Sequence, residues 1–247
     1  MTKHLFLIAK LLIPSKVIIK ANSIKSIQMW NRKIGIYFTL LCILIVILIA
    51  QQIISPTVDT HNIPILLTIL FAFVISAGTN LYLSLNSQYS RLEKEINKNT
   101  NKYRWKEFSL SSSLMVLVLA QLLGIYDIST LILLFTCHFT AVLLSADVES
   151  SYPNKKKLIA PLVTSIILYT SVWLILLGRS RQFDSASILS VSNLAYLTYI
   201  LFCIYPALFV LQFTKKFKEY YGIVERIFSL WSFISKMIFV IFVVAIL

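Results

Sequence analysis

The chain alternates between long apolar runs and short polar or charged segments. Its charged borders separate seven apolar runs, near residues 34–55, 63–86, 105–124, 128–146, 158–178, 187–212 and 222–246. Each run has about the 20 residues that an α-helix needs to cross the hydrocarbon core of a bilayer. Because open strands cannot satisfy their backbone groups in lipid, the runs predict helices. The predicted fold class is an all-α membrane protein, a seven-transmembrane-helix bundle.

Residues 1–25 are predicted to be a separate amphipathic N-terminal segment. Its apolar core, LFLIA, is short, Lys10 interrupts the apolar stretch, and no cleavage site of small residues follows. We therefore interpret it as a segment lying at the membrane interface in preference to a cleaved signal peptide. Residues 26–247 are then predicted to form a single seven-helix domain.

Composition agrees with a membrane protein. Of the 247 residues, 58% are hydrophobic and 13% are charged, whereas a soluble domain has about 25% charged residues. The formal net charge of +13 could suggest nucleic acid, but the basic residues sit in short clusters between apolar runs. We therefore exclude nucleic-acid binding. The three cysteines form no disulfide framework, and the three histidines form no metal-ligand pattern.

The distribution of basic residues predicts the orientation in the membrane. Of the 23 Lys and Arg residues, 20 lie in the N-terminal region or in the loops after the second, fourth and sixth predicted helices. These segments share one side of the membrane, and the other side has only Arg179 and Arg181. The positive-inside rule then places the N-terminus in the cytoplasm and the C-terminus outside the cell. We expect the membrane to be the plasma membrane.

Lys236 stands near the centre of the last apolar run, ERIFSLWSFISKMIFVIFVVAIL. A charged side chain at this depth costs about 2.5–3.5 kcal/mol on insertion scales, so we expect a buried partner. Glu107, near the cytoplasmic end of the third span, is the acid expected at a matching depth. Side chains tilt toward the N-terminus of their helix, which for the last helix is the cytoplasmic end, so Lys236 leans toward the depth of Glu107. Ser232 shares a face with Lys236, and Ser111 and Met115 share one with Glu107. A purely structural Lys–Glu pair is the alternative interpretation.

These residue types also predict a specific chemistry. A lysine in an apolar pocket can attack an aldehyde as the neutral amine. The resulting protonated Schiff base would need a carboxylate counter-ion. A lysine in the last of seven helices and a carboxylate in the third therefore suggest a retinal protein.

At these residues the chain resembles the heliorhodopsin family. The segment RWKEFSLSSSLMVLVLAQLLGIYDI carries the family pattern R-W-x-E-[YF]-S-x-S-x-S followed by G-I-x-D. Glu225, Ser232 and Lys236 have the family's spacing in the seventh span, and WNRKIGIYF and LQF add support. The resemblance covers about residues 26–246.

The resemblance implies all-trans-retinal covalently linked to Lys236 as a protonated Schiff base, with Glu107 as its counter-ion. It implies that Ser232 lies beside the Schiff base and that Phe202 packs against the polyene. His138 replaces the family's asparagine in the fourth span and adds a titratable group there. The resemblance also implies a homodimer with a slow photocycle. Such a protein would act as a sensory photoreceptor, and neither as a pump nor as an enzyme.

The chain departs from the family at several positions. Phe38 and Asn80 stand where the family often has histidines thought to hold the released proton, and the connection SPTVDTHNIP is short.

Lysine-rich cytoplasmic loops could be recognised by a signalling partner with an acidic face. The extracellular half of the last span, MIFVIFVVAIL, has no polar group, which argues against pumping. A light-gated proton channel and a seven-helix transporter without chromophore remain the alternatives.

Overall fold

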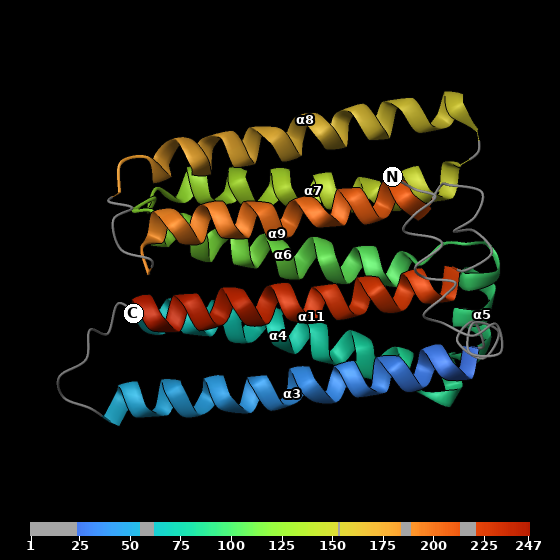
Figure 1. Cartoon of the computed structure of the whole chain (residues 1–247), viewed down its shortest axis with the longest axis horizontal. Helices are drawn as coiled ribbons and strands as arrows, with labels where there is room; N and C mark the ends of the chain where they lie inside the picture. The colour runs from blue at the N-terminus through green and yellow to red at the C-terminus, as the bar shows by residue number, and fades with distance from the viewer. Residues whose placement is uncertain (1–23, 55–61, 153, 184–188, 213–220) are drawn as a thin grey trace, which may run out of the picture.

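The computed structural model describes residues 24–54, 62–152, 154–183, 189–212 and 221–247 (Figure 1). All regular elements within these ranges are helical. The predicted amphipathic segment falls almost entirely at residues 1–23, outside the described residues.

Among the described residues, seven long helices run side by side along the long axis of the molecule (Figure 1). They are α3 (Ile24–Ile54), α4 (Asn62–Leu83), α6 (Lys102–Leu122), α7 (Ile128–Ser151), α8 (Lys155–Ser180), α9 (Val191–Gln212) and α11 (Tyr221–Ile246). A 3₁₀ turn, η1 (Asn86–Gln88), and the short helix α5 (Tyr89–Asn97) connect α4 to α6. They lie at one end of the bundle, which we call the α5 end (Figure 1).

Six of the described helices are long and apolar enough to cross a membrane, and α6 is the long helix that falls outside this group. The protein is therefore an integral membrane protein. Helix α6 carries the charged sequence KYRWKE in its first turns, and twelve of its 21 residues are buried against other helices. A helix surrounded by protein does not need the fully apolar surface that lipid demands. This explains why α6 combines a central position with a polar sequence.

Helix α3 begins at Ile24, ten residues before the predicted span. The basic residues Lys25, Arg32 and Lys33 therefore lie within the helix. An apolar run marks the part of a helix that can sit in lipid, whereas the helix itself continues as long as its backbone hydrogen bonds do. Predicted spans and helix ends therefore differ most where a helix projects beyond its apolar part.

Asx residues cap the first turns of three successive helices. The side chains of Asn101, Asp127 and Asn154 accept hydrogen bonds from the backbone N–H groups three residues later, at the starts of α6, α7 and α8. Such a cap satisfies one of the N–H groups that a helix start leaves without a partner. Local sequence therefore fixes where these helices begin.

Helix α6 ends in a Schellman motif. Gly124 has a φ of 71°, a left-handed conformation that glycine adopts without strain. Its N–H donates to the Gln121 carbonyl at 2.9 Å, and the Ile125 N–H donates to the Ala120 carbonyl at 3.0 Å. Because the Asp127 cap follows at once, α6 and α7 are joined by a tight, locally determined turn.

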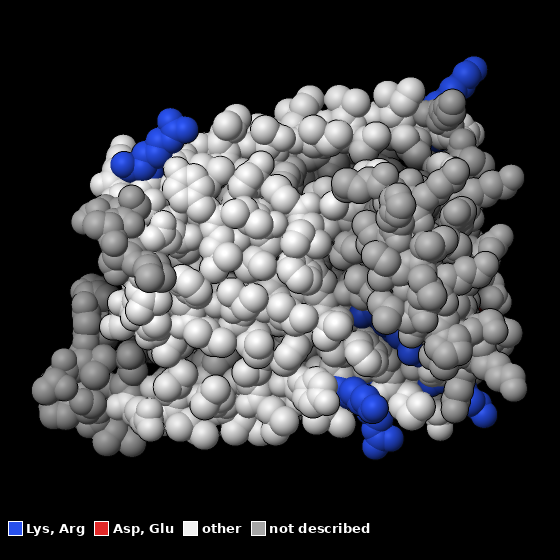
Figure 2. Space-filling model, in the orientation of Figure 1, with Lys and Arg blue, Asp and Glu red and all other residues white. Residues whose placement is uncertain are grey.

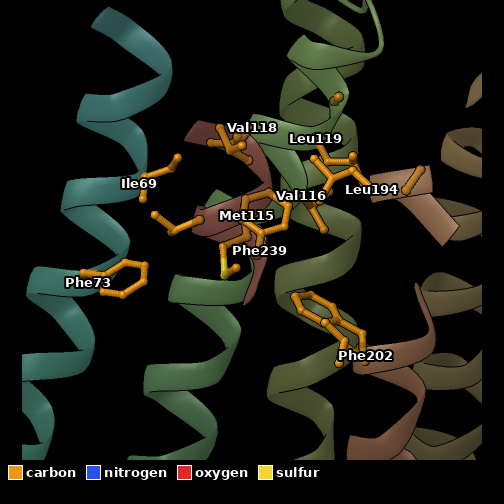
Figure 3. Packing of buried hydrophobic residues seen from close by; sticks show 14 of the residues in the cluster. Ile69, Phe73, Met115, Val116, Val118, Leu119, Leu194, Phe202 and Phe239 are labelled. Atoms are coloured by element: carbon orange, nitrogen blue, oxygen red, sulfur yellow. The ribbon is translucent and has the colours of Figure 1, made fainter. Parts of the chain in front are cut away.

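The largest core cluster lies between the helices in the half of the bundle away from α5. Ile69 and Phe73 of α4, Met115 of α6 and Phe239 of α11 turn toward one another there (Figure 3). Outside, the middle of the visible face is free of charged side chains, and the visible Lys and Arg residues lie toward the two ends (Figure 2). The described part of the bundle thus has an apolar core in the half away from α5, and the middle of its visible face is apolar (Figure 2).

Candidate functional site

A buried ion pair joins α11 to α6. Lys236 Nζ lies 2.5 Å from Glu107 Oε1, and the two residues are 2% and 5% exposed. Each charge is thus removed from solvent and neutralised by the other. Removing one partner from such a pair costs about 3–5 kcal/mol, because the remaining charge stays buried. The pair therefore fixes the relative depth of the two helices.

Two serines complete the surroundings of the Glu107 carboxylate. Ser76 of α4 accepts a hydrogen bond from Lys236 Nζ at 2.7 Å and donates one to Glu107. Ser111, one turn after Glu107, donates to the same Oε1 atom at 3.0 Å. Hydrogen bonds to charged groups contribute about 1.5–3 kcal/mol each. The carboxylate is thus held in one orientation by groups from three helices.

Lys236 also borders an apolar cavity of about 260 Å³. Its walls come from α6, α7, α8 and α9 and are largely aromatic and aliphatic. Phe108, Phe202 and Tyr205 are among the lining rings, and the Phe108 and Tyr205 ring centroids lie 5.0 Å apart. Ligand pockets are typically apolar cavities with a few placed polar groups. An apolar cavity with a single amine at its border is suited to a long apolar ligand that carries one reactive end.

His138 of α7 lies on the wall of this cavity and is 1% exposed. Its Nε2 atom is 3.2 Å from the Ser112 hydroxyl oxygen of α6. The His138 ring also lies 6.0 Å from the Phe202 ring, centroid to centroid. The histidine therefore faces the ligand cavity and is not part of the Lys236–Glu107 pair.

A second, much smaller cavity of about 20 Å³ lies between Glu107 and Glu225. Asn31, Asn80 and Ser232 contribute polar side chains to its wall. To hold one water molecule, a cavity needs roughly 10–15 Å³ of space available to the centre of that molecule, and two to four polar partners. The space thus suits a single water between the two carboxylates.

Toward the α5 end, a buried cluster surrounds Arg104. Its guanidinium pairs with Glu149 at 2.6 Å and with Glu225, and all three residues are at most 5% exposed. Asn101 donates to Glu225 Oε2 at 2.7 Å, and Trp105 Nε1 donates to Glu149 Oε2 at 2.9 Å. Two carboxylates share one guanidinium, so the three charged groups sum to −1. We call these five residues the Arg104 cluster.

The residues singled out from the sequence thus lie in related but different places. Lys236, Glu107 and Ser111 are directly hydrogen-bonded, and Ser232 is buried beside the small polar cavity. Met115 is fully buried in the apolar core. The remaining two, His138 and Phe202, line the large cavity.

Sequence reasoning missed two features of the site. It did not single out Ser76, although a serine inside the apolar run FVISAGTN is a detectable signal, since polar groups in a span usually face the bundle interior. It also did not single out Glu149 and Glu225 as partners of Arg104, which it counted only among the basic residues of a loop. The structure buries all three together. Lys236 could be matched to Glu107 because both stand inside apolar runs, whereas residues near the ends of the runs gave no comparable signal of their partners.

The sequence model of the family described as Heliorhodopsin matches residues 27–246 of this chain. The match spans all the long helices that the structure describes except the first three residues of α3. No curated protein matches the chain. The family comprises light-sensing membrane proteins that bind retinal.

Proposed function

Because the chain belongs to the heliorhodopsin family, we propose that it is a light sensor in which all-trans-retinal is linked to Lys236 as a protonated Schiff base and Glu107 is the counter-ion. One observation carries this proposal. The Lys236 amine lies at the border of an apolar cavity and 2.5 Å from a buried carboxylate. A Lys–Glu pair that served packing alone would not need a cavity beside it.

The residues present fit such a group. Retinal has an apolar chain and ring and a single aldehyde carbon, and the cavity offers apolar walls and a single amine. Bound retinal would supply absorption of visible light and isomerisation. The chain itself would supply Glu107 to balance the positive nitrogen, Ser76 and Ser111 to orient that carboxylate, and aromatic walls to exclude water.

The central experiment is pigment formation. The full chain is expressed, purified and incubated with all-trans-retinal, and a visible absorption band is expected. Lys236→Ala should insert in the membrane and give no band, while Lys106→Ala serves as a matched control, because Lys106 is an exposed lysine of α6. A colourless wild-type protein would instead favour a transporter without chromophore, and a coloured Lys236→Ala variant would exclude the attachment site.

We further propose seven spans with the α5 end in the cytoplasm. The excess of lysine and arginine in the segments at this end supports the orientation. Tyr126 is 74% exposed at the other end, and Asn97 is exposed at the α5 end. In intact cells, an impermeant thiol reagent should therefore label Tyr126→Cys and should label Asn97→Cys only after permeabilisation. The reverse labelling pattern would overturn the orientation.

The polar groups support sensing more than pumping. The small polar cavity and the Arg104 cluster lie on the α5 side of Glu107, whereas Met115, Leu119 and Phe239 fill the core on the other side. A pump needs proton-exchanging groups on both sides of the site. Among the described buried residues, the carboxylates other than Glu107 are Glu149 and Glu225, and both lie on the α5 side. The proposal is therefore a sensor whose signal leaves through the cytoplasmic end.

Light-gated proton conductance is the second candidate. The cavity between Glu107 and Glu225, together with His138 on the other cavity, favours it, because both put exchangeable groups inside the bundle. Voltage clamp under illumination at several pH gradients separates the two functions. Photocurrents that reverse at the proton equilibrium potential would replace the sensory proposal, and an absence of current at every voltage would remove the channel.

Family resemblance also supports a homodimer, and the lysine-rich loops support a cytoplasmic partner with an acidic face. A dimeric mass of the pigment in detergent is the expected result for the first. For the second, substituting glutamine for the exposed lysines Lys94 and Lys98 should weaken binding of an acidic partner. A monomeric mass that persists after reconstitution would contradict the homodimer.

A further inference from the structure

Three aromatic side chains next to the large cavity carry buried polar atoms without a hydrogen-bond partner among the described residues. They are Nδ1 of His138, the hydroxyl of Tyr169 and Nε1 of Trp173. The Tyr169 hydroxyl and Trp173 Nε1 lie close enough for a weak hydrogen-bond interaction with each other, but its geometry falls outside that of a regular hydrogen bond, and His138 Nδ1 has no such neighbour. Leaving a buried donor or acceptor unsatisfied costs about 1–3 kcal/mol. Three such atoms in one place therefore point to a missing polar partner.

The three rings form a compact group. The ring centroids of His138 and Tyr169 are 5.6 Å apart, those of Tyr169 and Trp173 are 6.2 Å apart, and those of His138 and Trp173 are 6.5 Å apart. His138 and Tyr169 line the cavity, and Trp173 packs against both of them. One small polar group in the cavity would thus lie beside His138 and Tyr169, with Trp173 directly behind them.

The hydrogen bonds of Ser112 define what His138 offers. Because the Phe108 carbonyl can only accept, we assign the single hydroxyl hydrogen of Ser112 to it, and with this assignment the Ser112 oxygen accepts from His138 Nε2. A neutral histidine has one N–H, which Nε2 then carries, and Nδ1 is left as an acceptor. The missing partner must therefore donate a hydrogen bond to His138. Trp173 Nε1 can only donate, so the same partner must also accept.

The group lies away from Lys236 along the cavity. Phe108 and Tyr205 lie at the Lys236 side, where Lys236 Nζ is 5.6 Å from the Phe108 ring and the Tyr205 hydroxyl is 2.8 Å from Ser235. Phe202 then connects Tyr205 to Trp173, with centroid distances of 6.0 and 5.6 Å. Trp173 belongs to α8, which lies at the edge of the bundle remote from α3 (Figure 1).

We propose that His138, Tyr169 and Trp173 form a hydroxyl-binding subsite and that the protein takes a retinal with a hydroxylated ring in preference to unsubstituted retinal. This inference rests on the proposed function, since a retinal linked through its aldehyde carbon has its ring at the far end of the molecule. A hydroxyl can donate to His138 Nδ1 and accept from Trp173 Nε1 or Tyr169 at the same time. A ring ketone can only accept, so it leaves His138 unsatisfied.

A competition experiment tests the subsite without using any light-driven activity. Purified protein without chromophore is incubated with equal amounts of all-trans-retinal and its 3-hydroxy, 4-hydroxy and 4-oxo derivatives. Borohydride then reduces the linkage, and mass spectrometry measures which retinoid is attached to the peptide that contains Lys236. One satisfied hydrogen bond corresponds to about a tenfold preference. We expect one of the two hydroxylated retinals to be enriched by at least this factor over both unsubstituted retinal and 4-oxo retinal.

Single substitutions test which residues produce the preference for hydroxylated retinal. Tyr169→Phe and His138→Leu should each reduce the enrichment toward the ratio for equal binding. The ratio is taken among the attached retinoids, so it does not depend on the total amount of retinal that each variant binds. Tyr199→Phe is the matched control, because Tyr199 packs on the Trp173 ring at 5.3 Å but does not line the cavity. It should keep the full enrichment.

Each alternative outcome has a defined meaning. Equal attachment, or preferential attachment of unsubstituted or 4-oxo retinal, would overturn the subsite and leave the proposed function intact, with a water molecule as the partner of the three atoms. Enrichment that survives both Tyr169→Phe and His138→Leu would also overturn it. Absence of any adduct at Lys236 would overturn the proposed function and this inference with it.

Discussion

Lys236 Nζ and Glu107 Oε1 lie 2.5 Å apart, although 129 positions separate the two residues in the chain. The two residues are 2% and 5% exposed, and Phe38 of α3 covers the pair on one side, with its ring centroid 5.3 Å from Nζ. In low dielectric surroundings a neighbouring charge acts strongly. Glu107 therefore has a larger influence on any positive charge at Lys236 than an exposed acid could have.

Glu107→Gln should shift the visible absorption band of the pigment to longer wavelength. The positive charge of the linkage lies near the nitrogen in the ground state and moves along the polyene on excitation, so a fixed carboxylate stabilises the ground state more. The pH at which the visible band is lost should also fall, by about 1–3 units, as expected for the loss of an adjacent opposite charge. Absorption spectra recorded during a pH titration measure both effects.

Glu93→Gln is the matched control for that prediction, since Glu93 lies on α5 and outside the site. An unchanged spectrum and an unchanged titration in Glu107→Gln would mean that another acid balances the charge. Glu225 would be the next acid to substitute, because it borders the same small cavity.

Ser76→Ala should shift the absorption band in the same direction as Glu107→Gln, but by less. The serine hydroxyl contacts both members of the pair, so its loss removes a hydrogen bond to a charged group, of about 1.5–3 kcal/mol, and keeps the charge itself. Ser84→Ala, which loses only a bond to the Leu81 carbonyl, should leave the band in place. A shift as large as that of Glu107→Gln would show that Ser76 does more than orient the carboxylate.

Arg104→Gln should destabilise the protein by about 3–5 kcal/mol, because Glu149 and Glu225 would stay buried without their cation. Thermal unfolding in detergent, followed by circular dichroism, measures the loss. Additional Glu149→Gln and Glu225→Gln substitutions should restore much of the stability by removing the unpaired charges. Arg91→Gln, at an exposed position of α5, should change little. A wild-type melting temperature for Arg104→Gln alone would contradict a structural role of the Arg104 cluster.

Asp127 is predicted to make the start of α7 sensitive to acid. The Thr130 hydroxyl and backbone N–H both donate to Asp127 Oδ2 at 2.7 Å and hold the pKa of this carboxyl below its ordinary value. A lowered folded-state pKa means that the stabilisation is present above the unfolded-state pKa of about 3.9 and is lost as the pH falls through the folded-state value. Asp127→Ala should therefore lower the melting temperature at pH 7.

Asp127→Asn provides the matched variant, because asparagine also caps helices but does not titrate. Its melting temperature should be close to that of the wild type at pH 7. Between pH 7 and about pH 3 it should not show the part of the decrease in melting temperature that comes from protonation of Asp127. If Asp127→Ala and the wild type melted together at pH 7, the cap would contribute nothing.

The sequence by itself determined the elements and their local ends. Apolar runs of sufficient length predict the helices because lipid imposes that length, and they coincide with the long helices of the structure. Asn101, Asp127 and Gly124 fix helix ends through contacts with residues at most four positions away. The pattern around Glu107 and Lys236 was also sufficient to indicate the family, which the match over residues 27–246 confirms.

Apart from the Lys236–Glu107 pair, only the tertiary structure decided which polar groups meet. Ser76 at the ion pair, Glu149 and Glu225 around Arg104, and Tyr169 beside His138 each meet a residue of a different helix. Their contacts depend on the rotation and depth of each helix, which are set by packing across the whole bundle. A sequence shows that a polar residue inside the membrane needs a partner, because burial without one is costly. Which partner it finds is fixed when all the helices pack together.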